Sequence, residues 1–117
     1  MADSIPLVSI VIPTRNCFLQ LSRLLDSIRQ QTFHNYEVIV IDNFSSDGTF
    51  ELACKHAKAF QKGPERHLQR PYGVSHARGE FLMFIDADME LDTDLLQQCA
   101  EYWRCRNSFA RSYPLVR

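Results

Sequence analysis

The sequence predicts an α/β fold, with a Rossmann-like, doubly wound and mostly parallel sheet in three layers, α/β/α. Three short segments, residues 7–12, 36–41 and 81–85, are almost continuously apolar and rich in β-branched or aromatic residues. Such segments are typical of strands that are covered on both faces. Apolar residues at helical spacing lie between and after these segments, so strands and helices alternate along the chain. We therefore expect right-handed βαβ units.

Three apolar stripes predict the helices, and a polar residue that can cap a helix stands before each stripe. The stripes cover residues 18–28, 50–60 and 95–103, and the expected caps are Asn16, then Ser46 or Asp47, then Asp92 or Thr93. The segment 62–80 is rich in Gly and Pro and is interpreted as irregular, with one short strand near residues 67–69.

Length and composition predict a single domain over residues 1–117, with a core over about residues 7–106 and an irregular tail over 107–117. The chain is 45% hydrophobic and 23% charged, which is ordinary for a globular protein. Its net charge of -1 provides no general attraction to nucleic acid, and we expect no nucleic-acid partner. No apolar stretch approaches the roughly 18 residues of a transmembrane helix, so we expect none.

The cysteines and the N-terminal segment bear on location. The four cysteines show no CxxC spacing, which argues against a zinc site. The first residues have no basic region before their short apolar run, so they do not resemble a signal peptide. We expect free thiols in a cytoplasmic protein, with peripheral association with a membrane as an open alternative.

Charge is distributed unevenly along the chain. Residues 55–78 contain six Lys or Arg and one acid, whereas residues 80–103 contain seven acids and no Lys or Arg. Two explanations remain open. The two segments form solvated faces of opposite sign, or they form a cationic wall opposite an acidic metal site, which suits an anionic ligand bridged by a cation.

The candidate metal ligands are Asp86 and Asp88, which follow the apolar residues 82–85. Carboxylates two residues apart at a strand end point to the same side, and ligands of parallel α/β sheets bind at this edge. Mg²⁺ and Mn²⁺ take one or two protein carboxylates together with phosphate oxygens. The alternative is that one Asp caps the following turn and the other is solvated.

Three further residues are candidates for binding a nucleotide. Asp42 ends the second strand and either accepts a hydrogen bond from a base or ribose, or forms the turn that follows through its neighbours. Arg70 and Arg78 precede the third apolar segment and are candidates for phosphate contacts.

A phosphatase of the haloacid-dehalogenase type also ends a strand in D-x-D, but it needs a downstream Lys, and none follows Lys62.

Four segments in chain order resemble the motifs of glycosyltransferase family 2, the inverting enzymes of GT-A fold. Residues 8–16 resemble the opening strand and nucleotide loop, and residues 37–49 resemble the second strand and acidic turn. Residues 69–73 resemble the Arg-Asn-x-Gly element, and residues 77–91 resemble the strand that carries the D-x-D. The resemblance covers most of the chain and implies the nucleotide-binding half of a GT-A fold.

The resemblance also implies a nucleotide-diphosphate sugar as donor, held through Mg²⁺ or Mn²⁺. By position in the motifs, the base and ribose pocket would be lined by Pro13, Thr14 and Asn16, and Asp42 would accept a hydrogen bond from the nucleobase. Arg70 would contact the nucleotide. Asp86 would lie against the ribose and near the metal, and Asp88 would be the principal metal ligand. Pro71 departs from the family pattern, because it replaces an Asn and has neither an N–H nor an amide side chain.

Family members continue well beyond the D-x-D region, into a part that supplies the acceptor site and the general base. The chain is therefore expected to be truncated after this region. Glu90, Asp92 and Asp94 are interpreted as charges at a helix start, so no catalytic base is assigned. Two functions remain open: inverting sugar transfer to an unknown acceptor, or an inactive or split donor-binding module that works with a partner chain or associates with itself through an uncovered sheet edge.

Overall fold

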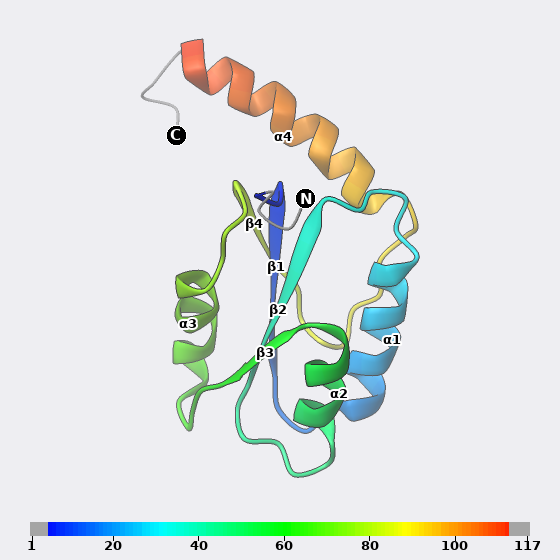
Figure 1. Cartoon of the computed structure of the whole chain (residues 1–117), viewed down its shortest axis with the longest axis vertical. Helices are drawn as coiled ribbons and strands as arrows, with labels where there is room; N and C mark the ends of the chain where they lie inside the picture. The colour runs from blue at the N-terminus through cyan, green and yellow to red at the C-terminus, as the bar shows by residue number, and fades with distance from the viewer. Residues whose placement is uncertain (1–4, 113–117) are drawn as a thin grey trace.

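The computed structural model describes residues 5–112, and the side chains of residues 5–105. Strands and helices alternate along this part of the chain (Figure 1). In chain order the elements are β1 (Val8–Thr14), α1 (Phe18–Arg29), β2 (Tyr36–Asp42), α2 (Thr49–His56), β3 (Lys58–Gln61), the 3-10 helix η1 (Arg66–Leu68), α3 (Gln69–Ser75), β4 (Phe81–Phe84) and α4 (Leu95–Ser112).

The four strands form one parallel sheet in the order β3–β2–β1–β4. β1 pairs with β2 along its whole length and with β4 over residues 8–11. The first three strands are added in one direction, and β4 then joins the free side of β1. This reversal at β1 is what makes the sheet doubly wound, and it confirms the predicted fold class.

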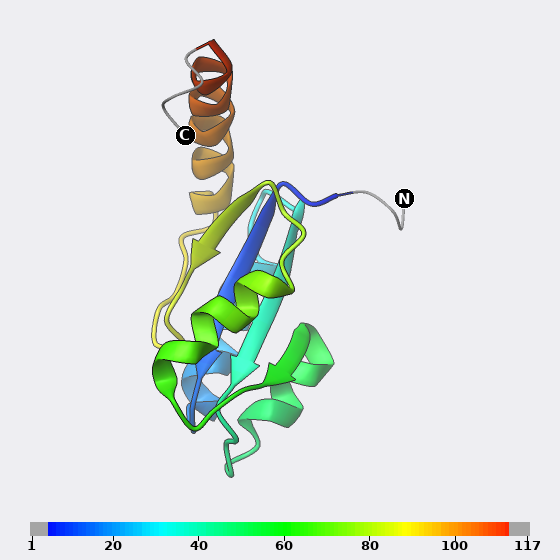
Figure 2. The ribbon, with the colours of Figure 1, turned by 90° about the vertical axis from the view of Figure 1, so that its left-hand side faces the viewer.

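Helices cover both faces of the sheet: α3 lies on one face, and α1 and α2 lie on the other (Figures 1 and 2). Successive side chains of β1 point to opposite faces of the sheet and so contribute to both helix layers. Ile10 and Ile12 belong to the core cluster with α1, whereas Val11 lies under α3. The buried side chains of α1 follow the predicted stripe and include Leu21 and Leu24. Burying each such aliphatic side chain contributes about 1.5–3 kcal/mol. The three-layer architecture is confirmed.

β3 lies where the sequence predicts the end of the second helix. α2 ends at His56, and Ala57 is extended, with φ -154° and ψ 173°. β3 then pairs with β2 as an edge strand, and its residues are exposed or only partly buried. An edge strand with one neighbour need not be apolar on both faces, so its sequence resembles the amphipathic helix before it.

η1 and α3 occupy the segment that the sequence predicts to be irregular, and residues 67–69 are helical rather than a strand. Pro71 stands in the first turn of α3, where the missing N–H costs no intrahelical hydrogen bond. Gly73 lies against the sheet, and a Cβ there would overlap Cγ1 of Val11. Pro and Gly therefore serve a short, closely packed helix here.

The start of α1 is capped by Asp47 in the loop before α2 and by Thr49, the first residue of α2, and not by Asn16. The backbone N–H of Phe18 donates to the Asp47 carboxylate at 3.2 Å, and that of Cys17 donates to Oγ1 of Thr49 at 3.1 Å. Asn16 has a left-handed backbone with φ 49°, and its side-chain oxygen accepts from the N–H of Ser46 at 2.8 Å. The loops after β1 and β2 are thus tied together.

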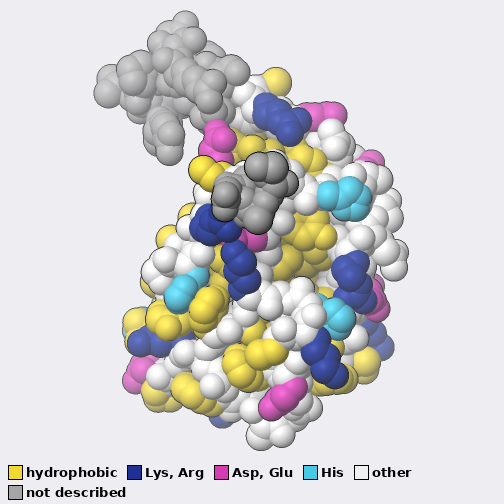
Figure 3. Space-filling view, in the orientation of Figure 1, with side chains coloured by type: hydrophobic (Ala, Val, Ile, Leu, Met, Phe, Trp, Pro, Cys, Tyr) yellow, Lys and Arg dark blue, Asp and Glu magenta, His cyan; other side chains and the backbone are white. Residues whose placement is uncertain are grey.

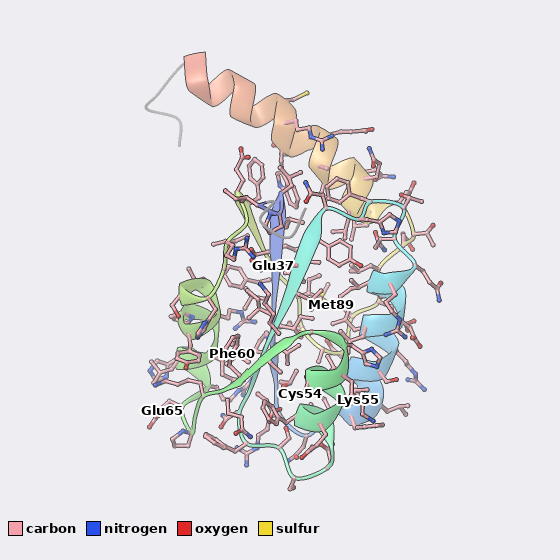
Figure 4. The ribbon with its side chains drawn as sticks, viewed as in Figure 1. Glu37, Cys54, Lys55, Phe60, Glu65 and Met89 are labelled. Atoms are coloured by element: carbon pink, nitrogen blue, oxygen red, sulfur yellow. The ribbon has the colours of Figure 1, made fainter. Side chains whose placement is uncertain are left out.

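A buried polar cluster joins three strands near the start of β2, where Figure 4 labels Glu37. The Glu37 carboxylate accepts from Ser9 Oγ at 2.5 Å, from Lys58 Nζ at 2.7 Å and from the N–H of Arg78 at 2.7 Å. The N–H of Gly79 donates to Ser9 Oγ. Burial alone would raise the pKa of Glu37, but these hydrogen bonds outweigh it and hold the pKa below its usual value.

α4 packs its first turns on the core through the buried side chains of Leu96 and Ala100, and the Trp103 ring stacks on Phe81 at 5.2 Å. The helix continues to Ser112, so residues 107–112 are helical and not the irregular segment expected there; residues 113–117 lie outside the described part. No helix among residues 5–112 has the length and apolar composition needed to cross a lipid bilayer.

Candidate functional site

The carboxyl ends of β1 and β4 and the start of α3 surround a cleft of about 1000 Å³. The cleft is lined by residues of three segments far apart in sequence: Pro13, Thr14, Arg15, Cys17 and Gln20, then Arg66, His67, Gln69 and Arg70, then Asp86, Ala87 and Asp88. Figure 4 labels Glu65, which directly precedes the second of these segments. Five of the seven predicted site residues line the cleft, namely Pro13, Thr14, Arg70, Asp86 and Asp88. Asn16 and Asp42 are not part of the lining.

Asp42 is fully buried and holds the turn after β2. Its carboxylate accepts from Thr14 Oγ1 at 2.7 Å, from the N–H of Ser45 at 2.8 Å and from Ser45 Oγ at 2.6 Å. Its exposed fraction is 0%. The structure therefore matches the alternative in which Asp42 forms the turn, and in this conformation its carboxylate has no surface to offer a nucleobase.

Asn16 holds the same turn from the other side. Its backbone N–H donates to Ser45 Oγ at 2.7 Å, and its side-chain oxygen accepts from the N–H of Ser46. Asn16 and Asp42 thus both hold the loop after β2 through hydrogen bonds. Asp42 lies behind the cleft lining and binds the Thr14 hydroxyl, whereas Asn16 is exposed and holds the turn from outside the lining.

Gln69 was not predicted from the sequence, yet it positions the start of α3. Its Nε2 donates to the carbonyl oxygens of Thr14 at 3.1 Å and of Ile41 at 2.8 Å, and the residue is buried. These bonds satisfy two carbonyl groups at the ends of adjacent strands. They also place Arg70, the next residue, over the cleft. A glutamine in an irregular-looking segment carries no sequence signal for this role.

Asp86 and Asp88 follow β4 at the edge of the cleft, with the small buried side chain of Ala87 between them. The Arg70 guanidinium donates to Asp86 Oδ1 at 2.9 Å, and both side chains are about half exposed. The N–H of Met89 donates to the carbonyl oxygen of Asp86, which turns the chain after the strand. The two carboxylates and the Arg70 guanidinium thus lie together in the lining of the cleft.

The donor set suits a hard divalent cation that brings further ligands with it. Among the described residues, no group of three or more His, Cys, Asp or Glu side chains is arranged to hold a metal. Asp86 and Asp88 offer two carboxylates, and Mg²⁺ or Mn²⁺ usually takes one or two from the protein and completes its shell with phosphate oxygens and water. The residues present therefore fit a cation bound together with a phosphate ligand.

Basic side chains line the same cleft as these carboxylates. Arg15, Arg66 and Arg70 line the cleft, together with His67. A cationic wall was one of the two explanations left open for the charge pattern, and the pattern did not single out Arg15, Arg66 or His67. Arg78, a candidate for phosphate contacts, is not in the lining, and its backbone N–H binds Glu37. Over the face in Figure 3, basic and acidic side chains are dispersed among apolar ones.

Cys17 also lines the cleft and was not predicted to do so. Burial raises the pKa of its thiol, so the group stays protonated near neutral pH and is a weak nucleophile. The described cysteines, Cys17, Cys54, Cys99 and Cys105, are all free thiols.

Comparison with known proteins agrees with this geometry. The family described as glycosyl transferase family 2 matches residues 9–108. The putative glycosyltransferase EpsH of Bacillus subtilis is 31% identical over 100 residues, which cover 80% of this chain and 29% of EpsH. Glycosyltransferase AglE of Haloferax volcanii is 32% identical over 100 residues, which cover 75% of this chain and 32% of AglE. The chain thus spans about a third of the length of these relatives.

Solved structures give the same result. TarS 1–349 of Staphylococcus aureus, in complex with UDP-GlcNAc, superposes with a TM-score of 0.73 at 29% identity, covering 81% of this chain and 30% of TarS. The mannosyltransferase PcManGT of Pyrobaculum calidifontis, in complex with GDP-Man and Mn²⁺, superposes with a TM-score of 0.62 at 26% identity, covering 75% of this chain and 29% of PcManGT. By sequence and by fold, the chain belongs to glycosyl transferase family 2.

Proposed function

We propose that this chain binds a nucleotide-diphosphate sugar in its cleft, through Mg²⁺ or Mn²⁺, as the donor for sugar transfer with inversion. The observation that carries the proposal is that two carboxylates and three arginines line one cleft at the carboxyl edge of a parallel sheet. The arginines suit the diphosphate, and the carboxylates suit a cation that bridges to it. The UDP-GlcNAc and GDP-Man complexes of similar structures support the ligand class.

In this proposal Asp88 is the principal metal ligand, and Asp86 is the second metal ligand and also lies against the ribose. Arg70 contacts the phosphates from the start of α3. A bound cation supplies Lewis-acid neutralisation of the diphosphate leaving group. The protein's own contribution is to hold these charged side chains on short, well-anchored elements, so that the backbone that carries them is in place before the donor arrives.

The base and ribose would lie toward the end of β1, beside Pro13 and Thr14. Thr14 is almost fully buried and donates its hydroxyl to Asp42, so its backbone and not its hydroxyl faces the ligand. We assign Asn16 and Asp42 an indirect role, because they fix the loops behind this wall. A direct contact between Asp42 and a base would require the turn at Ser45 to move.

A second candidate is a donor-binding module that does not complete transfer without another part. It is favoured because Asp86 and Asp88 are the only acids among the described residues that line the cleft, and the proposed metal site uses both. We assign no catalytic base, and the acceptor stays unassigned. In this case a partner chain, or a second copy, would pair with the uncovered edge of the sheet at β4.

A thermal-shift panel tests donor binding. UDP, GDP, CDP and TDP are each added with and without Mn²⁺, and we expect one of them to raise Tm only when the metal is present. Ligand at about one hundred times Kd stabilises a protein by about 2.7 kcal/mol, so the shift is several degrees. Asp88→Ala should abolish the shift, whereas Asp94→Ala, which removes an exposed acid outside the lining, should keep it. No shift with any nucleotide would refute donor binding.

A hydrolysis assay separates the two candidates. The protein is incubated with Mn²⁺ and a nucleotide sugar that carries the nucleotide found to bind in the thermal-shift panel. The nucleotide that is released is then measured. Turnover above the buffer rate indicates that the chain activates the donor alone. Binding without turnover indicates the donor-binding module.

We also propose a cytoplasmic location, with peripheral membrane association as the alternative. The support is that the exposed residues Cys54 and Cys105 are free thiols, which persist in a reducing compartment. Fractionation of cells that express the chain distinguishes a soluble from a membrane-associated pool.

A further inference from the structure

Arg70 and Asp86 form an ion pair across the cleft, between the first turn of α3 and the end of β4. The distance from Arg70 Nη2 to Asp86 Oδ1 is 2.9 Å. Gln69 anchors this end of α3 to the strand carbonyl groups, so Arg70 is held near Asp86 by a buried neighbour. The pair itself is about half exposed, so solvent and ligands reach it.

This ion pair engages Asp86, a carboxylate that the proposed metal site also needs. One oxygen of Asp86 accepts from a guanidinium, and a divalent cation at Asp86 would approach that guanidinium with like charge. The charge of the whole lining has the same effect, because it contains three arginines and two aspartates, a net charge of +1 with His67 neutral. The cleft without ligand is therefore a poor site for a cation alone and a better site for an anion.

We propose that Arg70 and the divalent cation exchange at Asp86, and that this exchange couples metal binding to nucleotide binding. The diphosphate draws Arg70 away from Asp86, and the cation then takes the vacated carboxylate beside Asp88. Each ligand thereby improves the affinity for the other, as linkage requires. This inference rests on the proposed function and adds to it a role for Arg70 in coupling the binding of the two ligands.

The first test measures Mn²⁺ affinity without nucleotide, by electron paramagnetic resonance of free Mn²⁺. Arg70→Gln removes the competitor, and we expect the affinity to rise about two- to fivefold, the range that an exposed ion pair supports. Arg66→Gln is the matched control, because it removes one arginine from the same lining and leaves the Arg70–Asp86 pair intact. Unchanged or weaker binding by Arg70→Gln, or an equal rise in Arg66→Gln, would overturn the proposal.

The second test measures UDP and GDP affinity in EDTA by calorimetry. Asp86→Asn releases Arg70 for the phosphates, so metal-free nucleotide should bind more tightly than to the wild type. Asp88→Asn removes the same charge two residues away and is the control for simple repulsion. A gain in Asp86→Asn that exceeds the gain in Asp88→Asn supports the exchange. An equal gain, or a loss in Asp86→Asn, contradicts it.

The failures of the two proposals are distinguishable. If the wild type binds no nucleotide even with Mn²⁺, the proposed function fails and the exchange fails with it. If the wild type binds both and Arg70→Gln matches it in Mn²⁺ affinity, only the exchange fails. The four substituted side chains are exposed, and urea unfolding of each variant verifies that the fold is intact.

Discussion

At the scale of single residues, Glu37 is a carboxylate that the fold needs in its ionised form. Only 9% of the residue is exposed, and its carboxylate joins β1, β3 and the segment before β4 through Ser9, Lys58 and the N–H of Arg78. A neutral acid would lose the attraction of Lys58 and would place a proton where three donors already point. Stability should therefore depend on the charge of this one group.

We expect stability to fall in acid because of Glu37. Its pKa is lower in the folded than in the unfolded chain, so protons bind preferentially to the unfolded chain. The stabilisation is complete above the ordinary glutamate pKa of about 4.3 and is lost as pH falls below it toward the lowered pKa. Glu37→Gln should cost about 1–3 kcal/mol at pH 7, the effect of leaving buried partners unsatisfied.

Urea unfolding between pH 7 and pH 3 measures both effects. The difference between wild type and Glu37→Gln should shrink as pH falls. A difference that stays constant with pH would show that Glu37 contributes by shape and not by charge.

At the scale of secondary-structure elements, α3 connects the sheet to the cleft. Gly73 brings the helix close to Val11 and Ile41, and Gln69 fixes its first turn. The helix has only seven residues, so its own hydrogen bonds contribute little to its stability. Its position, and with it the position of Arg70, depends on this contact with the sheet.

Gly73→Ala should therefore destabilise the protein, although alanine is the better helix former by about 1 kcal/mol. The added Cβ overlaps a β-branched side chain with little rotamer freedom, and it also lies 3.2 Å from Ile41 Cγ1. We expect a loss of about 1–3 kcal/mol in urea unfolding, as for other overpacked sites. Val11→Ala in the same chain should restore part of it. A gain in stability on Gly73→Ala would show that α3 is not closely packed.

The elements also show what could be predicted from sequence. β1 and β2 were predicted because continuous apolar runs reflect burial on both faces. β4 was predicted by the same pattern, although it is an edge strand whose residues alternate between partly buried and exposed. β3 was missed because it is an edge strand of four partly exposed residues directly after a helix. α3 was missed because Pro71 and Gly73 suggest a loop, and only the packing against Val11 reveals why a helix tolerates them.

At the scale of the whole molecule, the sheet ends in two edges of different character. β3 is covered by α2 on one side, and β4 pairs only with β1 within the described residues. On β4, Leu82 and Phe84 are 42% and 46% exposed and point to the same face of the sheet as Val11. An edge that presents apolar side chains and unpaired backbone groups is prone to pair with another chain.

We expect the isolated chain to self-associate through this edge. Replacing Leu82 and Phe84 together by Lys should reduce association, because charged side chains on an edge strand disfavour pairing. Sedimentation velocity over a range of concentrations measures the effect. Replacing the exposed Tyr102 of α4 by Lys is the control and should leave association unchanged. A wild type that stays monomeric at high concentration would contradict this prediction.

The cleft as a whole was only partly predictable. Thr14, Asp86 and Asp88 were predicted to lie together because the ends of parallel strands meet at one edge of the sheet, and they line one cleft. Arg15, Arg66 and Gln69 were not singled out, because their positions depend on how α3 packs and on loop conformation. The sequence around Asp42 is compatible with an exposed side chain that binds a ligand and with a buried one that forms a turn. Only the tertiary hydrogen bonds distinguish these two roles.

The tie between the loops after β1 and β2 has a consequence for recognition. Asn16, Asp42, Asp47 and Thr49 link the two loops to each other and to the start of α1 through side-chain hydrogen bonds. These bonds hold the two loops in one arrangement, so the conformational entropy of both is lost when the chain folds. A ligand that binds beside Pro13 and Thr14 then meets a surface that is already rigid, and more of its contact energy appears as affinity.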